Sequence, residues 1–292
     1  MKKRFTYLAG ALSLAALVQY IELKQFEVTN YKYKTRKVSK KIRLAVLADL
    51  HGVEFGKENS RLVHAVKESC PDLILIPGDY ITAEEEGFYR KKGYPLAAIQ
   101  LLKELLEVAP VYYAMGNHES RLAAGKDMRG HVWNWYQKQA KAAGVYFLRN
   151  KSELLSVNGD LLEIGGLEID LSYYAKMVDI HMRDHYIESI YPKKKKEEAF
   201  QIIMAHNPVF FEQYLDLQPD LILSGHTHGG LVRIPGYGSV ISPELKLFPN
   251  YDAGRYDREG ASMFVSRGLG THTYPIRIFN RAELMTIDLE PV

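Results

Sequence analysis

The sequence predicts a mixed α/β fold, with βα units in the first part of the chain and antiparallel strands later. Short apolar runs that end in polar residues recur from residue 42 onward, which is typical of buried strands in a sheet covered on both faces. Amphipathic stretches of helical period lie between the first of these runs. In the middle of the chain, "LLSVNGDLLEIGGLEIDL" has Asn158-Gly159 between two apolar runs, which is a strong hairpin signal.

Length and composition limit the classes of protein to consider. The chain has 292 residues, of which 47% are hydrophobic and 25% charged, so it fits one large globular domain or two small ones and excludes a disordered protein. A net charge of +3 does not by itself indicate a nucleic-acid partner, which a concentrated basic face would favour. The single cysteine, Cys70, excludes an internal disulfide framework.

The N-terminus differs in composition from the rest of the chain. Lys2 to Arg4 precede the stretch Phe5 to Ile21, which has no charged side chain, and Glu22 follows it. We interpret residues 1–22 as an N-terminal membrane helix, an uncleaved signal anchor that would hold the protein at the cell membrane as a single-pass protein. A cleaved signal peptide, which would leave the protein exported, and a helix of a soluble core are the alternatives.

Residues 23–41 are interpreted as a basic linker between this helix and a domain that spans residues 42–292. The positive charges after the apolar stretch outnumber those before it, so charge counting leaves the side of the membrane open. The charged residues of the linker are Lys24, Lys32, Lys34, Arg36, Lys37, Lys40 and Lys41, beside Glu27.

The first elements of the domain alternate between strands and helices. One helix starts at an Asn59 or Ser60 cap and runs to about Ser69, and another opens at Pro95, a residue suited to the first turn of a helix. The predicted buried strands are Ile42–Ala48, Leu73–Ile76, Val111–Ala114, Gln201–Met204 and Leu221–Leu223.

Polar residues follow each of these five strands, in the segments "LADLH", "PGDY", "MGNHE", "AHNP" and "SGHTH". Any one of them has an ordinary explanation as a turn residue or a helix cap. Ligands of open α/β sheets, however, bind at the carboxyl ends of strands, and five strand ends with such residues together predict a common metal site. The candidates are Asp49, His51, Asp79, Asn117, His118, His206, His226 and His228.

The residue types indicate the kind of metal site. Imidazole, carboxylate and amide ligands without a thiolate suit Mn, Fe or Zn and exclude an iron–sulfur cluster. The candidates outnumber the ligands of one ion, so we expect two divalent ions joined by a bridging carboxylate. Two such ions, about 3.5–4 Å apart, activate water. The positive charge of two divalent ions exceeds the negative charge of two aspartates. The site is therefore positive, which favours the binding of an anion such as a phosphate ester.

These motifs carry a family resemblance. Asp-x-His, Gly-Asp, Gly-Asn-His-Glu, a histidine after a strand, and Gly-His-x-His, in that order, resemble the calcineurin-like metallophosphoesterase superfamily over about residues 42 to 290. Within it, "ILIPGDY", "GHTHGG" and "FVSRGLGT" are similar to the branch of bacterial membrane-associated phosphodiesterases that includes the UDP-2,3-diacylglucosamine hydrolases.

The resemblance implies a four-layer α/β/β/α sandwich, with two mixed sheets face to face and helices outside. It implies that His118 is not a ligand but a catalytic residue beside the substrate, where it stabilises the phosphate or protonates the departing oxygen. Asp79 would bridge the two ions. One ion would take Asp49, His51 and His228, and the other would take Asn117, His206 and His226.

The function implied by the resemblance is hydrolysis of a phosphoester, preferentially a phosphodiester, by in-line attack of a metal-bridging hydroxide. The predicted membrane helix favours the hypothesis of a lipid-linked or envelope-linked substrate. A nuclease, suggested by the basic segment Lys32 to Arg43, and a non-catalytic, membrane-anchored metal-binding protein are the alternatives. Because no further basic and aromatic face is evident, we expect no nucleic-acid partner, and no obligate protein partner is indicated.

The residues that bind the rest of the substrate stay unknown from the sequence. The segment Leu231 to Gly270 combines glycine, proline and aromatic residues directly after the last ligand, and we expect it to form part of the cleft wall. Arg233, Arg255 and Arg267 are either partners of a second anionic group or structural residues. His272 could reach the cleft.

Overall fold

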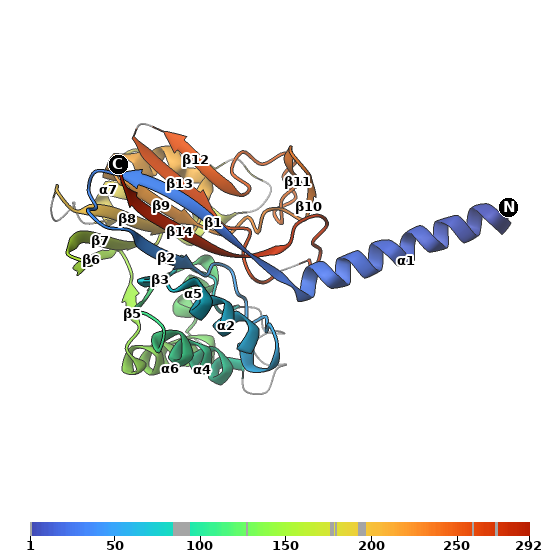
Figure 1. The fold of residues 1–292 in the computed structure, drawn as a ribbon, viewed down its shortest axis with the longest axis horizontal. Helices are drawn as coiled ribbons and strands as arrows, with labels where there is room; N and C mark the ends of the chain where they lie inside the picture. The colour runs from blue at the N-terminus through green and yellow to red at the C-terminus, as the bar shows by residue number, and fades with distance from the viewer. Residues whose placement is uncertain are drawn as a thin grey trace.

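The predicted α/β class holds, with two mixed six-stranded sheets that carry helices on their outer faces (Figure 1). A computed structural model describes residues 2–83, 94–126, 128–175, 178, 180–191, 197–258, 260–271 and 274–292. His272 lies outside these residues, so the expectation that it reaches the cleft has no structural counterpart.

The first sheet has the order β1-β14-β2-β3-β4-β5. Its strands β2 to β5 are parallel to one another, whereas β14 runs antiparallel to β2 and parallel to β1. All carboxyl ends of β2 to β5 therefore lie at one edge. In chain order the strands are β1 (Phe26–Thr35), β2 (Ile42–Val46), β3 (Leu73–Ile76), β4 (Val111–Ala114), β5 (Tyr146–Leu148) and β14 (Ala282–Pro291).

The second sheet has the order β12-β13-β9-β8-β7-β6. Its four central strands are parallel, and the edge strands β12 and β6 are antiparallel to their neighbours. The predicted hairpin is confirmed, because Val157 pairs with Asp160 across the Asn158-Gly159 turn. The strands are β6 (Lys151–Val157), β7 (Asp160–Leu167), β8 (Phe200–Ala205), β9 (Leu221–Ser224), β12 (Gly254–Arg258) and β13 (Ala261–Val265), with a separate hairpin of β10 (Val232–Ile234) and β11 (Gly238–Ile241).

Helices cover the outer face of each sheet. Within the described residues, the helices are α1 (Lys2–Lys24), which does not cover a sheet, α2 (Ser60–Ser69), α4 (Tyr94–Leu106), α5 (Asn117–Ala124), α6 (Met128–Ala143), α7 (Tyr186–Ile190) and α8 (Phe211–Tyr214), with short 3-10 turns at Lys57–Asn59, Leu171–Tyr174, Pro208–Phe210 and Leu215–Leu217. Helices α2, α4 and α6 pack on the first sheet, and α7 and α8 pack on the second.

The apolar core has three layers that match this arrangement. The central layer lies between the sheets and includes Leu44 and Val46 of β2 with Ile202 and Met204 of β8. The two outer layers lie beneath the helices. The order is thus helix, sheet, sheet, helix, which agrees with the expected α/β/β/α sandwich.

The segment predicted to be a basic linker is instead mostly strand β1. All ten of its residues pair in parallel with β14, from Phe26 opposite Ala282 to Thr35 opposite Pro291. The alternation of its side chains explains the error: Tyr31 and Tyr33 pack edge-on against Phe264 and Phe200 of the second sheet, while lysines occupy the positions between. The ordered domain therefore begins before residue 42.

The apolar N-terminal stretch forms α1, which stands out from the rest of the chain (Figure 1). Its last turns contact the C-terminal part of the chain, where the Gln19 amide donates to the Pro275 carbonyl at 2.6 Å. In the described part of the chain, no helix is long and apolar enough to cross a membrane. The predicted membrane helix at residues 1–22 is therefore not supported.

Candidate metal centre

The first sheet supplies the centre with side chains from three loops. Asp49 and His51 follow β2, Asp79 follows β3, and Asn117 and His118 begin α5 directly after β4. Backbone hydrogen bonds tie the first two loops together, with Asp49 N donating to Gly78 O at 3.2 Å and His51 N to Asp79 O at 3.1 Å. All five predicted residues are buried.

The second sheet supplies three histidines. His206 follows β8, and His226 and His228 follow β9. The two sheets meet here through hydrogen bonds, because the His226 amide donates to both Asp49 carboxylate oxygens, at 2.9 and 3.1 Å. The predicted ligands from five strand ends therefore do converge at one place.

Five of the converging residues have a left-handed backbone, which is uncommon outside glycine. The φ angles are 51° for Asp49, 47° for His51, 51° for Asp79, 69° for His226 and 51° for His228. Such conformations cost free energy and concentrate at functional sites, where the surrounding structure holds them in place. Their number at one edge indicates that side-chain placement outweighs backbone preference here.

Two glycines permit the close approach of these loops. A Cβ atom on Gly225, just before His226, would lie 2.4 Å from Asp49 Oδ2, and one on Gly116, just before Asn117, would lie 2.2 Å from Asp79 Oδ1. Any side chain at either position would displace a predicted ligand. The glycine of the Gly-His-x-His segment is therefore required by packing against Asp49.

Three histidines use one ring nitrogen for a hydrogen bond to an oxygen that can only accept. His206 Nδ1 donates to Pro77 O at 2.9 Å, His228 Nδ1 to Gly270 O at 2.9 Å, and His226 Nε2 to the Glu244 carboxylate at 2.9 Å. Each bond fixes the tautomer and leaves the other nitrogen as a lone-pair donor toward the centre. This is the arrangement that a metal-binding imidazole needs.

His118 has the opposite arrangement. The backbone N–H of Ala83 donates to its Nδ1 at 2.8 Å, so a neutral His118 carries its proton on Nε2. That nitrogen lies 4.0 Å from Asp79 Oδ2 at the cavity between the ligands. His118 is therefore arranged to offer a proton and not a lone pair.

The remaining side chains form groups that could hold cations. One group is Asp49, His51 and His228, and another is Asp79, His206 and His226; within each group the ligand atoms lie within 4.8 Å of one another. A further group of His51, Asp79 and His118 overlaps both. Asp79 shares a group with His206 and His226, and its Oδ2 also lies 3.8 Å from His51 Nε2 of the first group.

The amide of Asn117 adds an oxygen to the second group. Its side-chain oxygen faces two acceptors, Asp79 Oδ2 at 3.3 Å and His226 Nδ1 at 3.0 Å, and its nitrogen faces the guanidinium of Arg121. In the absence of a cation, rotation of the amide would satisfy all of these groups better. An amide oxygen turned toward a cation here would complete a donor set of two imidazoles, a carboxylate and an amide, and these residue types fit a divalent metal ion.

The electrostatics of the centre agree with cation binding. Burial alone would raise the pKa of Asp79, but His206 and His118 hold it well below its ordinary value. Burial would lower the pKa of His206, yet Asp79 raises it to about 9. In the metal-free chain a proton on His206, 3.1 Å from Asp79, thus takes the place that a divalent ion could occupy.

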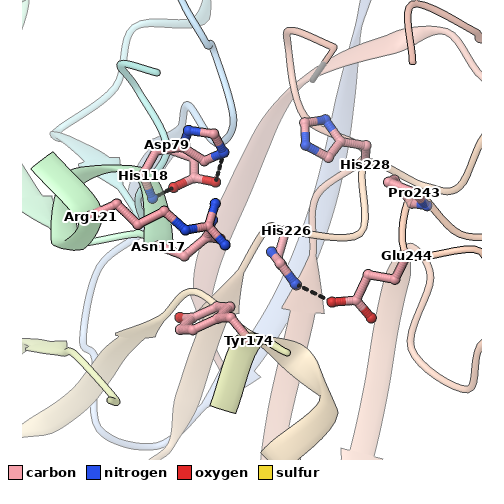
Figure 2. A pocket seen from close by; sticks show the side chains of 9 residues that line it. All are labelled: Asp79, Asn117, His118, Arg121, Tyr174, His226, His228, Pro243 and Glu244. Carbon is pink, nitrogen blue, oxygen red and sulfur yellow. Dashed lines mark hydrogen bonds and ion pairs between the residues drawn. The ribbon is translucent and has the colours of Figure 1, made fainter. Parts of the chain in front are cut away.

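The cavity at this centre includes residues that the sequence did not indicate. Arg121 of α5, Tyr174, and Glu244 of the loop after β11 line it together with the predicted ligands (Figure 2). Arg121 and Glu244 lie on opposite sides of His226 in this view. The helical spacing could have indicated Arg121, which follows His118 by one turn, but Tyr174 and Glu244 have no local signal.

The arginines considered from sequence have structural partners instead. Arg233 pairs with Asp252 at 2.9 Å, and Arg267 pairs with Glu27 and Glu283 at 2.6 and 3.1 Å. Arg255 lies over the rings of Tyr33 and Phe264. Of the two alternatives, the structure favours the structural role for all three.

Comparisons with known proteins agree with the motifs. The family described as calcineurin-like phosphoesterase matches residues 42–230. Among curated proteins, the uncharacterized metallophosphoesterase YkuE of Bacillus subtilis is 25% identical and covers 96% of this chain and 94% of its own. The B. subtilis protein YpbG is 28% identical with coverage of 97% and 96%, and the phosphodiesterase YaeI of Escherichia coli is 27% identical with coverage of 85% and 82%. None of these three is named as a UDP-2,3-diacylglucosamine hydrolase, so that finer resemblance is not confirmed.

Proposed function

The chain belongs to the calcineurin-like phosphoesterase family, and on that premise we propose that it is a metal-dependent phosphodiesterase with a two-ion centre. The observation that carries the proposal is the opposite hydrogen bonding of His118 and the histidines 206, 226 and 228. A purely structural metal site needs the lone-pair donors but has no use for a buried proton donor beside them. The name of the E. coli relative YaeI, a phosphodiesterase, favours a diester over a monoester.

The donor set suits two divalent ions of Mn, Fe or Zn. Asp49, His51 and His228 would hold one ion, and Asn117, His206 and His226 the other, with Asp79 between them. When bound, such ions polarise a phosphoryl oxygen and lower the pKa of water from 15.7 toward about 7. The positive charge of Arg121, at the same cavity, adds to the attraction for a phosphate ester.

His118 would act on the substrate itself. His118 lines the cavity, its Nε2 lies 4.0 Å from Asp79 Oδ2, and its Nδ1 accepts from Ala83 N. We expect the ring to donate a hydrogen bond to a phosphoryl oxygen and to transfer its Nε2 proton to the departing ester oxygen. In-line attack by water from the opposite side would form the new P–O bond as the ester P–O bond breaks. The expectation of a lipid-linked substrate depends on the predicted membrane helix, so it is not part of this proposal.

The test is hydrolysis of bis(p-nitrophenyl) phosphate and p-nitrophenyl phosphate by the purified chain with added Mn²⁺ or Zn²⁺. We expect faster turnover of the diester, and a loss of at least about a hundredfold in Asp79→Asn, because an ion loses its bridging carboxylate. The control is Asp184→Asn, because Asp184 is exposed and does not line the cavity at the metal centre. Activity that survives in Asp79→Asn contradicts the two-ion centre.

A second variant separates catalysis from metal binding. His118→Ala should keep the metal content of the wild type, measured by elemental analysis, and lose about 100-fold or more in kcat, because the ring no longer donates a hydrogen bond to the phosphoryl oxygen or a proton to the departing oxygen. Loss of bound metal in His118→Ala would make it a ligand and contradict its proposed role. Full metal binding by the wild type without turnover of either ester would favour the non-catalytic alternative.

A further inference from the structure

A second cavity adjoins the candidate metal centre on the side of Glu244. Its volume is about 330 Å³, and Glu244 lines both this cavity and the one at the metal centre. Thr227, which stands between His226 and His228 in the chain, also lines it. The second cavity therefore begins directly beside the proposed metal ligands.

The sizes of the two cavities suggest a division of roles. The space among the proposed ligands is about 20 Å³, whereas one water molecule needs about 10–15 Å³ by the same measure. Pockets that enclose organic ligands typically measure about 300–1,000 Å³. The metal centre thus has room for water and the phosphoryl oxygens, and the organic part of a substrate must lie elsewhere, for which the second cavity is large enough.

The wall of the second cavity is formed before any substrate binds. In the loop after β11, Ser242 N donates to Lys246 O at 2.9 Å, and Leu245 N donates back to Ser242 O at 2.9 Å. Phe248 N donates to Val240 O of β11 at 3.0 Å. Because these bonds fix the loop, little conformational entropy would be lost when a ligand settles against it.

The side chains of this wall suit a flat, largely apolar group. Leu247 and Phe248 are 67% and 69% exposed, and exposed large apolar side chains beside a cavity indicate contact with an apolar partner. The Tyr251 ring is held edge-on by Phe211 at 5.8 Å and Tyr256 at 5.0 Å, so it offers a rigid aromatic surface. Polar substituents of the ligand would meet the remaining lining, Ser242, Lys246 and Asn250.

The position of His118 indicates which half of a diester lies there. His118 and Glu244 stand on opposite sides of the metal-centre cavity (Figure 2). If His118 gives its proton to the departing oxygen, the departing group lies on the His118 side. A diester carries only two organic groups, so a group that occupies the cavity beside Glu244 is then the one that stays on phosphorus. In an in-line displacement this group projects sideways from the line of attack, which leaves the face opposite the departing oxygen to water.

From this we infer that the second cavity binds the retained organic group of a phosphodiester and selects an aryl or similarly flat alcohol at that position. The inference rests on the proposed function. In the reaction, water loses one proton to the solvent and its oxygen bonds to phosphorus, the P–O bond to the departing group breaks, and the departing oxygen takes a proton from His118. The products are an alcohol and a phosphate monoester that still carries the group held in the second cavity.

The test varies the retained group and keeps the departing group constant. Methyl p-nitrophenyl phosphate and phenyl p-nitrophenyl phosphate both release p-nitrophenol, so kcat/KM with Mn²⁺ can be compared directly. We expect the wild type to prefer the phenyl ester by about tenfold or more, from stacking and burial of the ring. Phe248→Ala should lower the phenyl-to-methyl ratio about tenfold, mainly through KM of the phenyl ester, and Leu247→Ala should lower it in the same direction.

Phe279→Ala is the matched control. Phe279 is 63% exposed and has a positive φ of 51°, close to the 69% and 48° of Phe248, but it lines neither cavity. This variant should keep the wild-type ratio. A wild-type ratio near one, or a ratio that Phe248→Ala and Leu247→Ala leave unchanged, overturns the inference while the proposed function stands. Failure to hydrolyse either ester overturns both.

Discussion

At the scale of single residues, the least expected feature is the carboxylate of Glu244. It comes from a loop 18 positions after His226 and accepts a hydrogen bond from His226 Nε2 at 2.9 Å. The bond leaves Nδ1 facing Asp79 and Asn117, so Glu244 orients a proposed ligand without being one itself. Partners of this kind typically change metal affinity by about 10- to 100-fold.

We therefore predict that Glu244→Ala lowers the affinity for Mn²⁺ by about tenfold or more, measured by isothermal titration calorimetry. Glu244→Gln should retain most of the affinity, because its amide oxygen still accepts from Nε2. Glu68→Ala, at an exposed position of α2, serves as the control. Equal affinities for all four proteins would show that Glu244 does not orient His226.

Glu119 follows His118, the proposed proton donor, but has a structural role. Its buried carboxylate accepts from the backbone N–H groups of Asp79, Ile81 and Gly116 and from the Tyr113 hydroxyl, at 2.7 to 3.2 Å. Burial raises its pKa to about 7. It thus joins the loops that carry Asp79 and Asn117.

Removal of this carboxylate leaves four buried donors without their acceptor. We expect Glu119→Ala to lower the free energy of unfolding in urea by about 2–4 kcal/mol, and Glu119→Gln to lower it less, because an amide oxygen replaces part of the acceptor set. A change below about 0.5 kcal/mol in Glu119→Ala would mean that water replaces the carboxylate at no cost.

At the scale of elements, the paired strands β2 and β14 bring Arg43 opposite Asp288. The guanidinium binds both carboxylate oxygens, at 2.5 and 2.9 Å, and this hydrogen bonding lowers the pKa of Asp288. A carboxyl whose pKa is lower in the folded chain stabilises it above the unfolded pKa of about 3.9. That contribution is lost as the pH falls through the folded pKa.

We therefore expect the wild type to be more stable than Asp288→Asn by about 1 kcal/mol at pH 7, because the ion pair is only partly shielded from solvent. The difference should shrink at and below about pH 4. Urea unfolding of both proteins at several pH values measures it. A difference that is the same at pH 7 and pH 3 would contradict the role of this ion pair.

The elements also show why sequence reasoning succeeds in some places and fails in others. The strands before Asp49, Asp79, Asn117, His206 and His226 were predictable, because a buried strand and its polar end are local patterns. Strand β1 was not, because its pairing with β14 joins residues about as far apart as the chain allows, and its lysines resemble a solvated linker. Glu244 reaches the centre from a loop and Tyr174 from a short 3-10 turn, where no hydrophobic period marks them.

At the scale of the whole molecule, the proposed metal ligands come from both sheets. Asp49, His51, Asp79 and Asn117 follow strands of the first sheet, and His206, His226 and His228 follow strands of the second. The apolar layer between the sheets already holds the two halves of the sandwich together, and bound ions would join them at a second place. Metal binding and folding should be coupled, because the unfolded chain does not bring these ligands together.

The consequence can be measured as a metal-dependent shift in thermal stability. At a free Mn²⁺ concentration 100 times the dissociation constant, stability should rise by about 2.7 kcal/mol, which for a chain of this size raises Tm by roughly 5–10 °C. Chelation with EDTA should reverse the rise. Asp79→Asn should lose most of it, because in the proposed centre Asp79 bridges the two ions, whereas Asp184→Asn should keep it. An equal rise in Asp79→Asn would show that the stabilising ions bind somewhere other than between the two sheets.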